Sequence, residues 1–161
     1  MNAHSFLTAV ASYPSFAPES SGIDEDTSYR DRADCERLLM ACYSLMDRGY
    51  YEASAELFSE DATWVRTEGT VRTRKGILAS LNRRPLQQLS RHFITNVVVT
   101  PMGDYAEATA YMVALHGVCT ANGPSPQPMA VCDLVARFRR GEDWEITYLE
   151  PVQVFAPPPA G

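Results

Sequence analysis

From residue 91 to residue 155 the chain has the pattern of long β-strands joined by short polar connections, and this stretch limits the folds that are open to it. Strands are expected at residues 91–100, 106–120, 129–140 and 144–155. Ahead of them, apolar residues recur with helical rather than strand spacing. Helices followed by an antiparallel meander are typical of an α+β fold. A strongly bent sheet that wraps over such helices encloses a concavity, where small ligands usually bind.

The first half of the chain predicts three helices and two short strands. The first helix starts near Asp31, which is placed to cap it, and stops at Gly49, where a left-handed residue commonly ends a helix. Its apolar face is formed by Cys35, Leu38, Leu39, Cys42 and Met46. The later elements are expected as helices at 51–58 and 75–82, with strands at 62–67 and 70–74.

The chain of 161 residues has the length of one domain, and its net charge of −6 argues against a nucleic-acid or anionic-membrane surface. Residues 1–27 are rich in Ser, Pro and Ala and predict a flexible arm. Residues 28–155 form one continuous domain without repeats. Residues 156–161 form a Pro-rich tail. No run of 18 apolar residues occurs, and we expect neither a membrane span nor a signal peptide.

The four cysteines, at positions 35, 42, 119 and 132, form no C-x-x-C pair. The three histidines, at positions 4, 92 and 116, lack the spacing of zinc ligands. Reduced thiols are the default in the cytosol. We therefore predict a cytoplasmic protein without a metal or another cofactor.

The strand at 91–100 carries polar residues on a largely apolar face. Alternate side chains of a strand share a face, so His92 and Asn96 are expected on the same side as Ile94 and Val98. The other side is also largely apolar, which predicts a strand covered on both sides. An unpaired buried polar group costs about 1–3 kcal/mol. His92 and Asn96 therefore need partners, either structural or catalytic.

Three segments, in order, resemble the SnoaL-like branch of the NTF2-like superfamily over residues 30–155. They are "LMDRGYYEASAELFSEDATW", "RHFITN" and "DLVARFRRGEDWEI". The resemblance implies an NTF2-like cone: a strongly bent antiparallel or mixed sheet wrapping about three N-terminal helices around a central pocket. The superfamily includes scytalone dehydratase, polyketide cyclases and the non-catalytic β subunits of ring-hydroxylating dioxygenases, so the fold alone does not fix the activity.

In the dehydratase-like members of this family, an aspartate at the end of the first helix pairs with the strand histidine. The matching positions are Asp47 and His92. The chain departs from scytalone dehydratase at two positions. Met46 stands where that enzyme has a tyrosine, and Val118 stands at the position of its second catalytic histidine. The substrate of that enzyme is therefore not carried over.

A histidine whose ring is oriented by a carboxylate is suited to proton abstraction near neutral pH. We therefore expect a cofactor-independent lyase or isomerase, dehydratase-like or cyclase-like, that acts on a small apolar ring compound. His92 is the predicted general base and Asp47 its orienting partner. The predicted substrate-binding residues have polar tips that could enter the pocket: Tyr43, Trp64, Asn96, Tyr111, His116, Asp133 and Tyr148.

Two other functions stay open from the sequence. The chain could be the non-catalytic β subunit of a ring-hydroxylating dioxygenase, with a larger oxygenase subunit as its partner, or a small-molecule binding domain. A homodimer or homotrimer is expected in any of these cases. The reason is that the outer sheet face would otherwise expose apolar rows that include Val97, Val99, Tyr111 and Val113.

Overall fold

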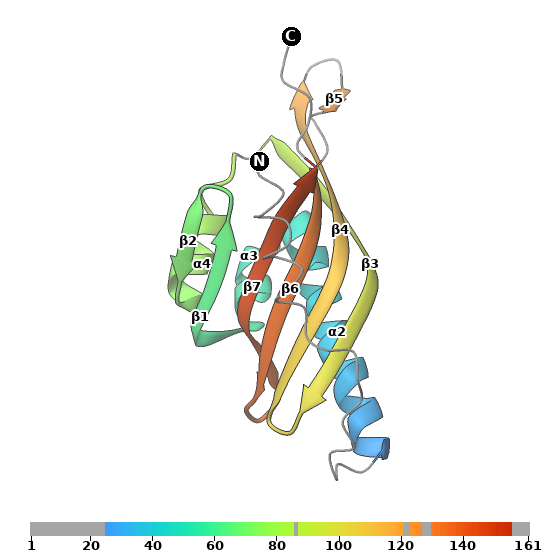
Figure 1. Cartoon of the computed structure of the whole chain (residues 1–161). Coiled ribbons are helices and arrows are strands. Elements are labelled where there is room, and N and C mark those ends of the chain that lie inside the picture. Colours follow the sequence, from blue (N-terminus) through green and yellow to red (C-terminus); the bar gives the residue numbers. More distant parts are fainter. Residues whose placement is uncertain (1–24, 86, 121–122, 127–129, 156–161) are drawn as a thin grey trace.

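The computed structural model describes residues 25–85, 87–120, 123–126 and 130–155. These residues form an α+β fold in which helices lie against one face of a curved, mixed sheet (Figure 1). The strand order is β2-β1-β7-β6-β4-β3, and β5 pairs with β4. This architecture confirms the predicted NTF2-like cone. The predicted tail and residues 1–24 of the predicted arm lie outside the described residues.

Helix α2 (Glu25–Asp47) buries the face that the helical spacing predicted, including Cys35, Leu39 and Cys42. It ends as expected, because Gly49 adopts a φ of +78° and its N–H donates to the carbonyl of Met46. The predicted start was wrong. Residues 25–30 are already helical, so Asp31 does not cap the helix.

Asp31 is instead buried within helix α2 and joins it to the far end of the sheet. Its carboxylate lies 2.6 Å from Nη2 of Arg140 and accepts a hydrogen bond of 3.3 Å from Nε1 of Trp144. The buried charge is therefore paired, as a charge in a core must be.

The short elements between α2 and the long strands follow the predicted order, and the second strand and the third helix lie within two residues of their expected bounds. The helix expected at 51–58 is shorter than predicted, and Phe58 begins the first strand instead. Helix α3 spans Tyr51–Ala55, β1 Phe58–Arg66, β2 Gly69–Arg72 and α4 Arg74–Leu81. Strand β1 pairs antiparallel with β2 and parallel with β7, which makes the sheet mixed. Helix α4 is capped by Thr73, whose Oγ1 accepts a hydrogen bond of 3.1 Å from the N–H of Gly76.

The long strands follow the predicted order. They are β3 (Gln88–Met102), β4 (Tyr105–Thr120), β6 (Ala130–Arg140) and β7 (Trp144–Phe155). One expectation was wrong, because the polar connection predicted between the strands at 106–120 and 129–140 contains strand β5 (Gly123–Pro126), which pairs with the end of β4. Among the residues that the structure describes, no helix combines the length and the apolarity needed to cross a membrane.

A β-bulge in β3 reverses the faces of the residues that follow it. Thr95 pairs with Tyr111, whereas Val98 pairs with Thr109, so β3 carries one extra residue here. Asn96 sits in the bulge with a φ of +54°. Val97 and Val99 consequently pack against the core, contrary to the prediction that they face outward.

The inner face of β4 changes character along its length. Near its start the inward side chains are alanines at 106, 108 and 110, which belong to the same buried core as Leu39 and Cys42 of α2. Further along, Met112 and Ala114 belong to this core as well, and together with His116 they line a cavity. Small side chains let a helix approach a sheet closely, and the cavity lies beyond this close contact.

Candidate active site

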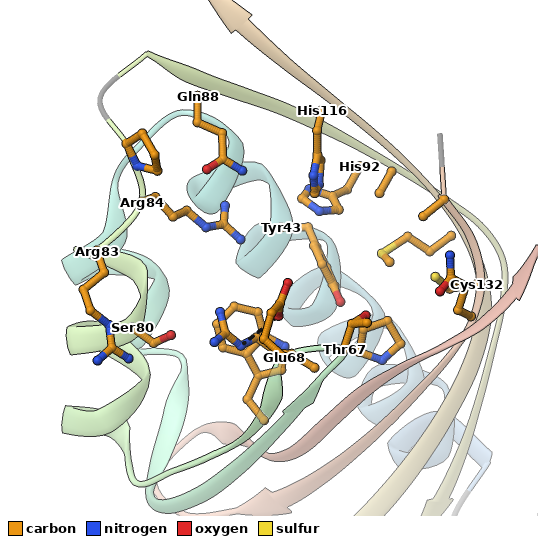
Figure 2. Close-up of a pocket in the computed structure, with 18 residues that line it drawn as sticks. Tyr43, Thr67, Glu68, Ser80, Arg83, Arg84, Gln88, His92, His116 and Cys132 are labelled. Carbon is orange, nitrogen blue, oxygen red and sulfur yellow. Dashed lines mark ion pairs between the residues drawn. The ribbon is translucent and has the colours of Figure 1, made fainter. Parts of the chain in front are cut away.

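A cavity of about 410 Å³ opens between the end of α2, helix α4 and the concave face of the sheet. Figure 2 shows side chains that point into it from the helices and from strands far apart in the sheet. Its lining combines apolar, polar and basic groups, which include Tyr43, Trp64, Arg66, Ser80, Arg84, His92, Met112, His116 and Cys132. A concave site of this size and mixed lining suits a small organic molecule.

His92 and Asp47 are in direct contact at one side of this cavity. Nδ1 of His92 lies 2.6 Å from Oδ1 of Asp47. The side chains of His92 and Asp47 are only 6% and 9% exposed, respectively. The His92 ring lines the cavity, whereas Asp47 does not. Because Asp47 engages Nδ1, the nitrogen of His92 that is left for a bound ligand is Nε2.

The local structure explains why these two residues meet across 45 positions of sequence. Asp47 is the last residue of α2, and Ser90 and His92 are neighbours on the inner face of β3. The Asp47 carboxylate accepts hydrogen bonds from Oγ of Ser90 at 2.8 Å and from the backbone N–H of His92 at 2.7 Å. Helix end and strand are thus joined through one carboxylate.

The Asp47 carboxylate stays ionised at neutral pH. Burial alone would raise its pKa, but the hydrogen bonds from His92, the interaction with the His92 ring and the bond from Ser90 outweigh burial and lower the pKa below 3.8. An ionised acceptor at Nδ1 favours the tautomer that carries its proton there. Nε2 of His92 then has a free lone pair that can accept a proton.

Tyr43 and His116 complete the surroundings of the His92 ring. The ring centroid of Tyr43 lies 4.8 Å from that of His92, and the centroid of His116 lies 6.0 Å from it. Burial raises the pKa of Tyr43 well above 10.0, so its hydroxyl remains a hydrogen-bond donor. Burial and the neighbouring His92 lower the pKa of His116 below 6.5, so His116 is largely neutral at pH 7.

The closeness of the two histidines predicts a measurable titration effect. We expect the ring protons of His116 to titrate in NMR spectra with a midpoint below 6.5, and this midpoint to rise in a His92→Gln variant. Burial is the largest cause of the lowered pKa of His116, and the substitution leaves that burial unchanged. The substitution does remove the charge of His92, which is the second cause. An unchanged or lower midpoint in the variant would contradict the coupling.

Three of the seven predicted substrate-binding residues line the cavity with His92: Tyr43, Trp64 and His116. The other four lie elsewhere, so their expected placement was wrong. Asn96 is exposed in the bulge of β3, and Tyr111 is 54% exposed on the outer face of β4. Asp133 pairs in register with Tyr111 and shares that outer face.

Tyr148 also lies outside the cavity, and a second bulge is the reason. Arg137 pairs with Tyr148 but Phe138 pairs with Ile146, so β7 has an extra residue between them. The side chain of Ile146 lies on the inner face of the sheet, and the extra residue places that of Tyr148 on the outer face. Its hydroxyl instead donates a hydrogen bond to Glu150, and its ring lies under the guanidinium of Arg137.

Sequence reasoning missed several residues of the site. Ser90 could have been found from its position two residues before His92, on the same strand face. Arg66 stands in the same relation to Trp64 on β1. Ser80 of α4 and Arg84 after it gave no signal, because their place in the cavity depends on how α4 packs.

Within the described part of the chain, no group of three or more His, Cys, Asp or Glu side chains is arranged to hold a metal ion. The cysteines at positions 35, 42 and 132 are buried free thiols. Burial, as the main cause, raises the pKa of the Cys42 thiol to about 12. Cys42 is therefore a packing residue rather than a nucleophile at neutral pH.

Solved structures with the same fold include an NTF2-like protein with a cystatin-like fold from Novosphingobium aromaticivorans. It has a TM-score of 0.67 and 23% identity, covering 81% of this chain and 86% of that one. A hexachlorocyclohexane dehydrochlorinase (LinA) type 2 has a TM-score of 0.68 and 18% identity, covering 82% and 97%. ActVI-ORFA from Streptomyces coelicolor has a TM-score of 0.62 and 18% identity, covering 76% and 96%.

No curated protein matches the sequence. The model of one domain family does match, and it covers most of the described fold. This match runs over residues 27–150, from the first turn of α2 into β7, and so includes both Asp47 and His92. The chain belongs to the SnoaL-like domain family.

Proposed function

We propose that the protein is a cofactor-independent lyase or isomerase that acts on a small ring compound bound in the cavity. The observation that carries this proposal is the contact of 2.6 Å between Nδ1 of His92 and Asp47, with the His92 ring in the cavity wall. A base that is oriented in this way is what proton abstraction from carbon requires. The hexachlorocyclohexane dehydrochlorinase with the same fold supports the proposal by its name, which describes an elimination.

In the proposed reaction, Nε2 of His92 takes a proton from a carbon of the ring compound. The electron pair of that C–H bond forms a C=C double bond. In an elimination, a hydroxyl or halide leaves from the neighbouring carbon with its bonding pair. A departing hydroxide takes the proton from the imidazolium, whereas after a halide leaves the imidazolium loses its proton to water. In an isomerisation, the imidazolium returns the proton to a different carbon. Asp47 stays ionised throughout and stabilises the imidazolium.

Tyr43 is placed to assist where negative charge develops. Its hydroxyl is buried, retains its proton and has no hydrogen-bond partner among the described residues. A donor of this kind, fixed before the reaction begins, stabilises an oxyanion or enolate oxygen. We assign it that role in the same reaction.

The proposal can be tested without knowing the natural substrate. 2-Tetralone is a two-ring ketone with acidic protons next to its carbonyl. The wild-type protein is expected to accelerate the exchange of these protons for deuterium in D₂O, followed by proton NMR. Buffer alone and heat-unfolded protein are the controls. If folded protein gives the same rate as unfolded protein, and 5-nitrobenzisoxazole, a ring-opening probe for general bases, also reacts equally with both, the proposed proton abstraction is rejected.

The outer sheet face supports a further proposal, that copies of the chain associate as a homodimer or homotrimer. Phe93 and Tyr111 are each 54% exposed on this face, and Val98 and Leu115 are each 40% exposed. The strand register places these side chains next to one another across β3 and β4. An exposed apolar patch of adjacent residues is typical of an interface.

A charge in this patch is expected to separate the subunits. Light scattering after size exclusion should give the wild-type protein two or three times the mass of the 17.9 kDa chain, and a Phe93→Glu variant the mass of one chain. Lys75→Glu, on the exposed side of α4, is the matched control and should leave the mass unchanged. A monomeric wild type would instead favour the alternative function as the β subunit of a ring-hydroxylating dioxygenase, in which this face binds a larger oxygenase subunit.

A further inference from the structure

The cavity wall contains buried polar atoms that have no hydrogen-bond partner within the described part of the protein. They are the hydroxyl of Tyr43, Nε1 of Trp64, Nε of Arg66 and Oγ of Ser80, four of the five such side-chain atoms among the described residues. Tyr43, Trp64 and Ser80 are only 3–4% exposed. Native structures pair nearly all buried polar groups. Four unpaired atoms around one cavity therefore indicate that a ligand completes them.

The chemistry of these atoms indicates what that ligand carries. The indole N–H of Trp64 and the guanidinium of Arg66 can only donate hydrogen bonds, and the hydroxyl of Ser80 can donate as well. A group that satisfies all three must therefore be an acceptor. Trp64, Arg66 and Ser80 are called the donor wall below.

The charge of the cavity favours an acceptor that is also negative. Arg66, Arg83 and Arg84 line the cavity, against one acidic residue, Glu68. This excess of positive charge lies in a chain whose net charge is −6. Glu68 does not neutralise Arg66 well, because its side chain is 73% exposed and its carboxylate stands 3.8 Å from Nε of Arg66. Figure 2 shows Arg84 reaching into the cavity, with Ser80 pointing inward from α4.

The donor wall and the proposed base approach the cavity from opposite ends of the sheet. Trp64 and Arg66 lie on β1, and Ser80 lies on α4 beside it, whereas His92 lies on β3 at the far edge. The guanidinium of Arg66 is held 5.0 Å above the Trp64 ring, which limits its freedom. A ligand anchored at one end of the cavity can thus present a carbon to His92 at the other.

We propose that the donor wall binds a carboxylate on the ring compound. Carboxylates form charge-assisted hydrogen bonds with guanidinium groups and also accept from indole N–H and hydroxyl groups, so one such group meets every unpaired donor of the wall. That the carboxylate belongs to the substrate rests on the proposed function. The anion site itself does not rest on the proposed function, because its residues are separate from His92 and Asp47.

The test compares two probes that differ in charge but hardly in shape, 2-naphthoate and neutral 2-naphthamide. Calorimetric titration of the wild-type protein at pH 7 is expected to show 2-naphthoate binding at least about tenfold more tightly, the effect of a charge-assisted hydrogen bond. An Arg66→Gln variant is expected to lose this preference. Arg72→Gln is the matched control, because Arg72 is exposed on β2 and outside the cavity, and it should keep the preference.

A Ser80→Ala variant provides a second measurement that a merely structural role would not give. Its affinity for 2-naphthoate is expected to fall several-fold. Its thermal stability without ligand should be equal to or above that of the wild type, because the substitution removes an unpaired buried hydroxyl. If Arg66→Gln does not fold, the affinity of Ser80→Ala for 2-naphthoate decides whether the donor wall binds the carboxylate. Full affinity for 2-naphthoate in Ser80→Ala, or equal wild-type affinity for both probes, overturns the inference.

The failure of this inference and the failure of the proposed function give different results. A His92→Gln variant is expected to retain the preference for 2-naphthoate and to lose the exchange of 2-tetralone. Preference for the carboxylate without any exchange by the wild type supports the anion site and rejects the proposed reaction. Exchange of 2-tetralone with equal binding of both naphthalene probes supports the reaction and rejects the anion site.

Discussion

A His92→Gln variant is expected to lower the rate of 2-tetralone exchange by about 10²–10⁴-fold, the usual contribution of general base catalysis. Glutamine has a similar length and retains a hydrogen-bonding group beside Asp47, but it cannot accept a proton at neutral pH. The catalytic loss should therefore come with an intact fold. Circular dichroism and retained binding of 2-naphthoate check the fold of the variant independently of its activity.

The matched control for this variant is Thr95→Gln, which places the same side chain on the same strand but on its exposed outer face. This control is expected to exchange 2-tetralone at the wild-type rate. A His92→Gln variant that keeps full activity while folded would show that another group takes the proton. His116, whose ring lies 6.0 Å from His92, would then be the next residue to replace.

The second large effect is expected from Asp47→Asn, in both activity and stability. An amide presents a donor as well as an acceptor, so it cannot accept from Ser90, from the His92 ring and from the His92 backbone at once. Loss of the correct imidazole tautomer is expected to reduce activity by about 10⁴-fold, as for the aspartate of a catalytic triad. Leaving a buried donor unpaired should also cost about 1–3 kcal/mol of unfolding free energy.

The stability effect has a defined dependence on pH. The pKa of Asp47 is lowered in the fold, despite burial, by its bonds to His92 and Ser90, so folding favours its ionised form. Its contribution is fully present above its ordinary pKa of 3.8 and is lost as the pH falls below that value. Urea denaturation should therefore show a full difference between wild type and Asp47→Asn at pH 7 and a smaller one near pH 3.

Asp104→Asn is the matched control for this comparison, because Asp104 is exposed in the turn between β3 and β4. It is expected to change neither the stability nor the pH profile by more than about 0.5 kcal/mol. A difference between wild type and Asp47→Asn that stays constant down to pH 3 would contradict the assigned role of the carboxylate.

The parts of this protein that follow a regular period could be predicted from its sequence. The apolar spacing of Cys35, Leu39 and Cys42 gave the buried face of α2, and Gly49 marked its end. The meeting of Asp47 with His92 came from a different source, the resemblance to a family, because no periodicity relates residues 45 positions apart. The alternation of a strand could also have predicted Ser90 and Arg66 as site residues, because each lies two positions from a residue already named, His92 and Trp64.

The misplacement of Asn96 and of Tyr148 has a common physical cause. Counting alternate residues from His92 to Asn96, or from Trp144 to Tyr148, assumes that a strand continues without interruption. One bulge lies between Thr95 and Val98 and another between Ile146 and Tyr148, and each moves the side chains that follow it to the other face. Asn96 takes its position at a φ of +54°, which asparagine tolerates better than most residues, yet this tolerance alone does not mark a bulge.

The inner face of β4 has a consequence for how the protein could change its ligand. The alanines at 106, 108 and 110 lie in the core with α2, and Met112, Ala114 and Cys132 belong both to that core and to the cavity wall. Ligand preference and stability therefore depend on the same three side chains. A library that varies 112, 114 and 132 would reshape the binding space, but each variant also replaces a buried core residue, so it must be selected for stability as well as for binding. Adaptation to a new ligand is in this sense coupled to folding at these positions.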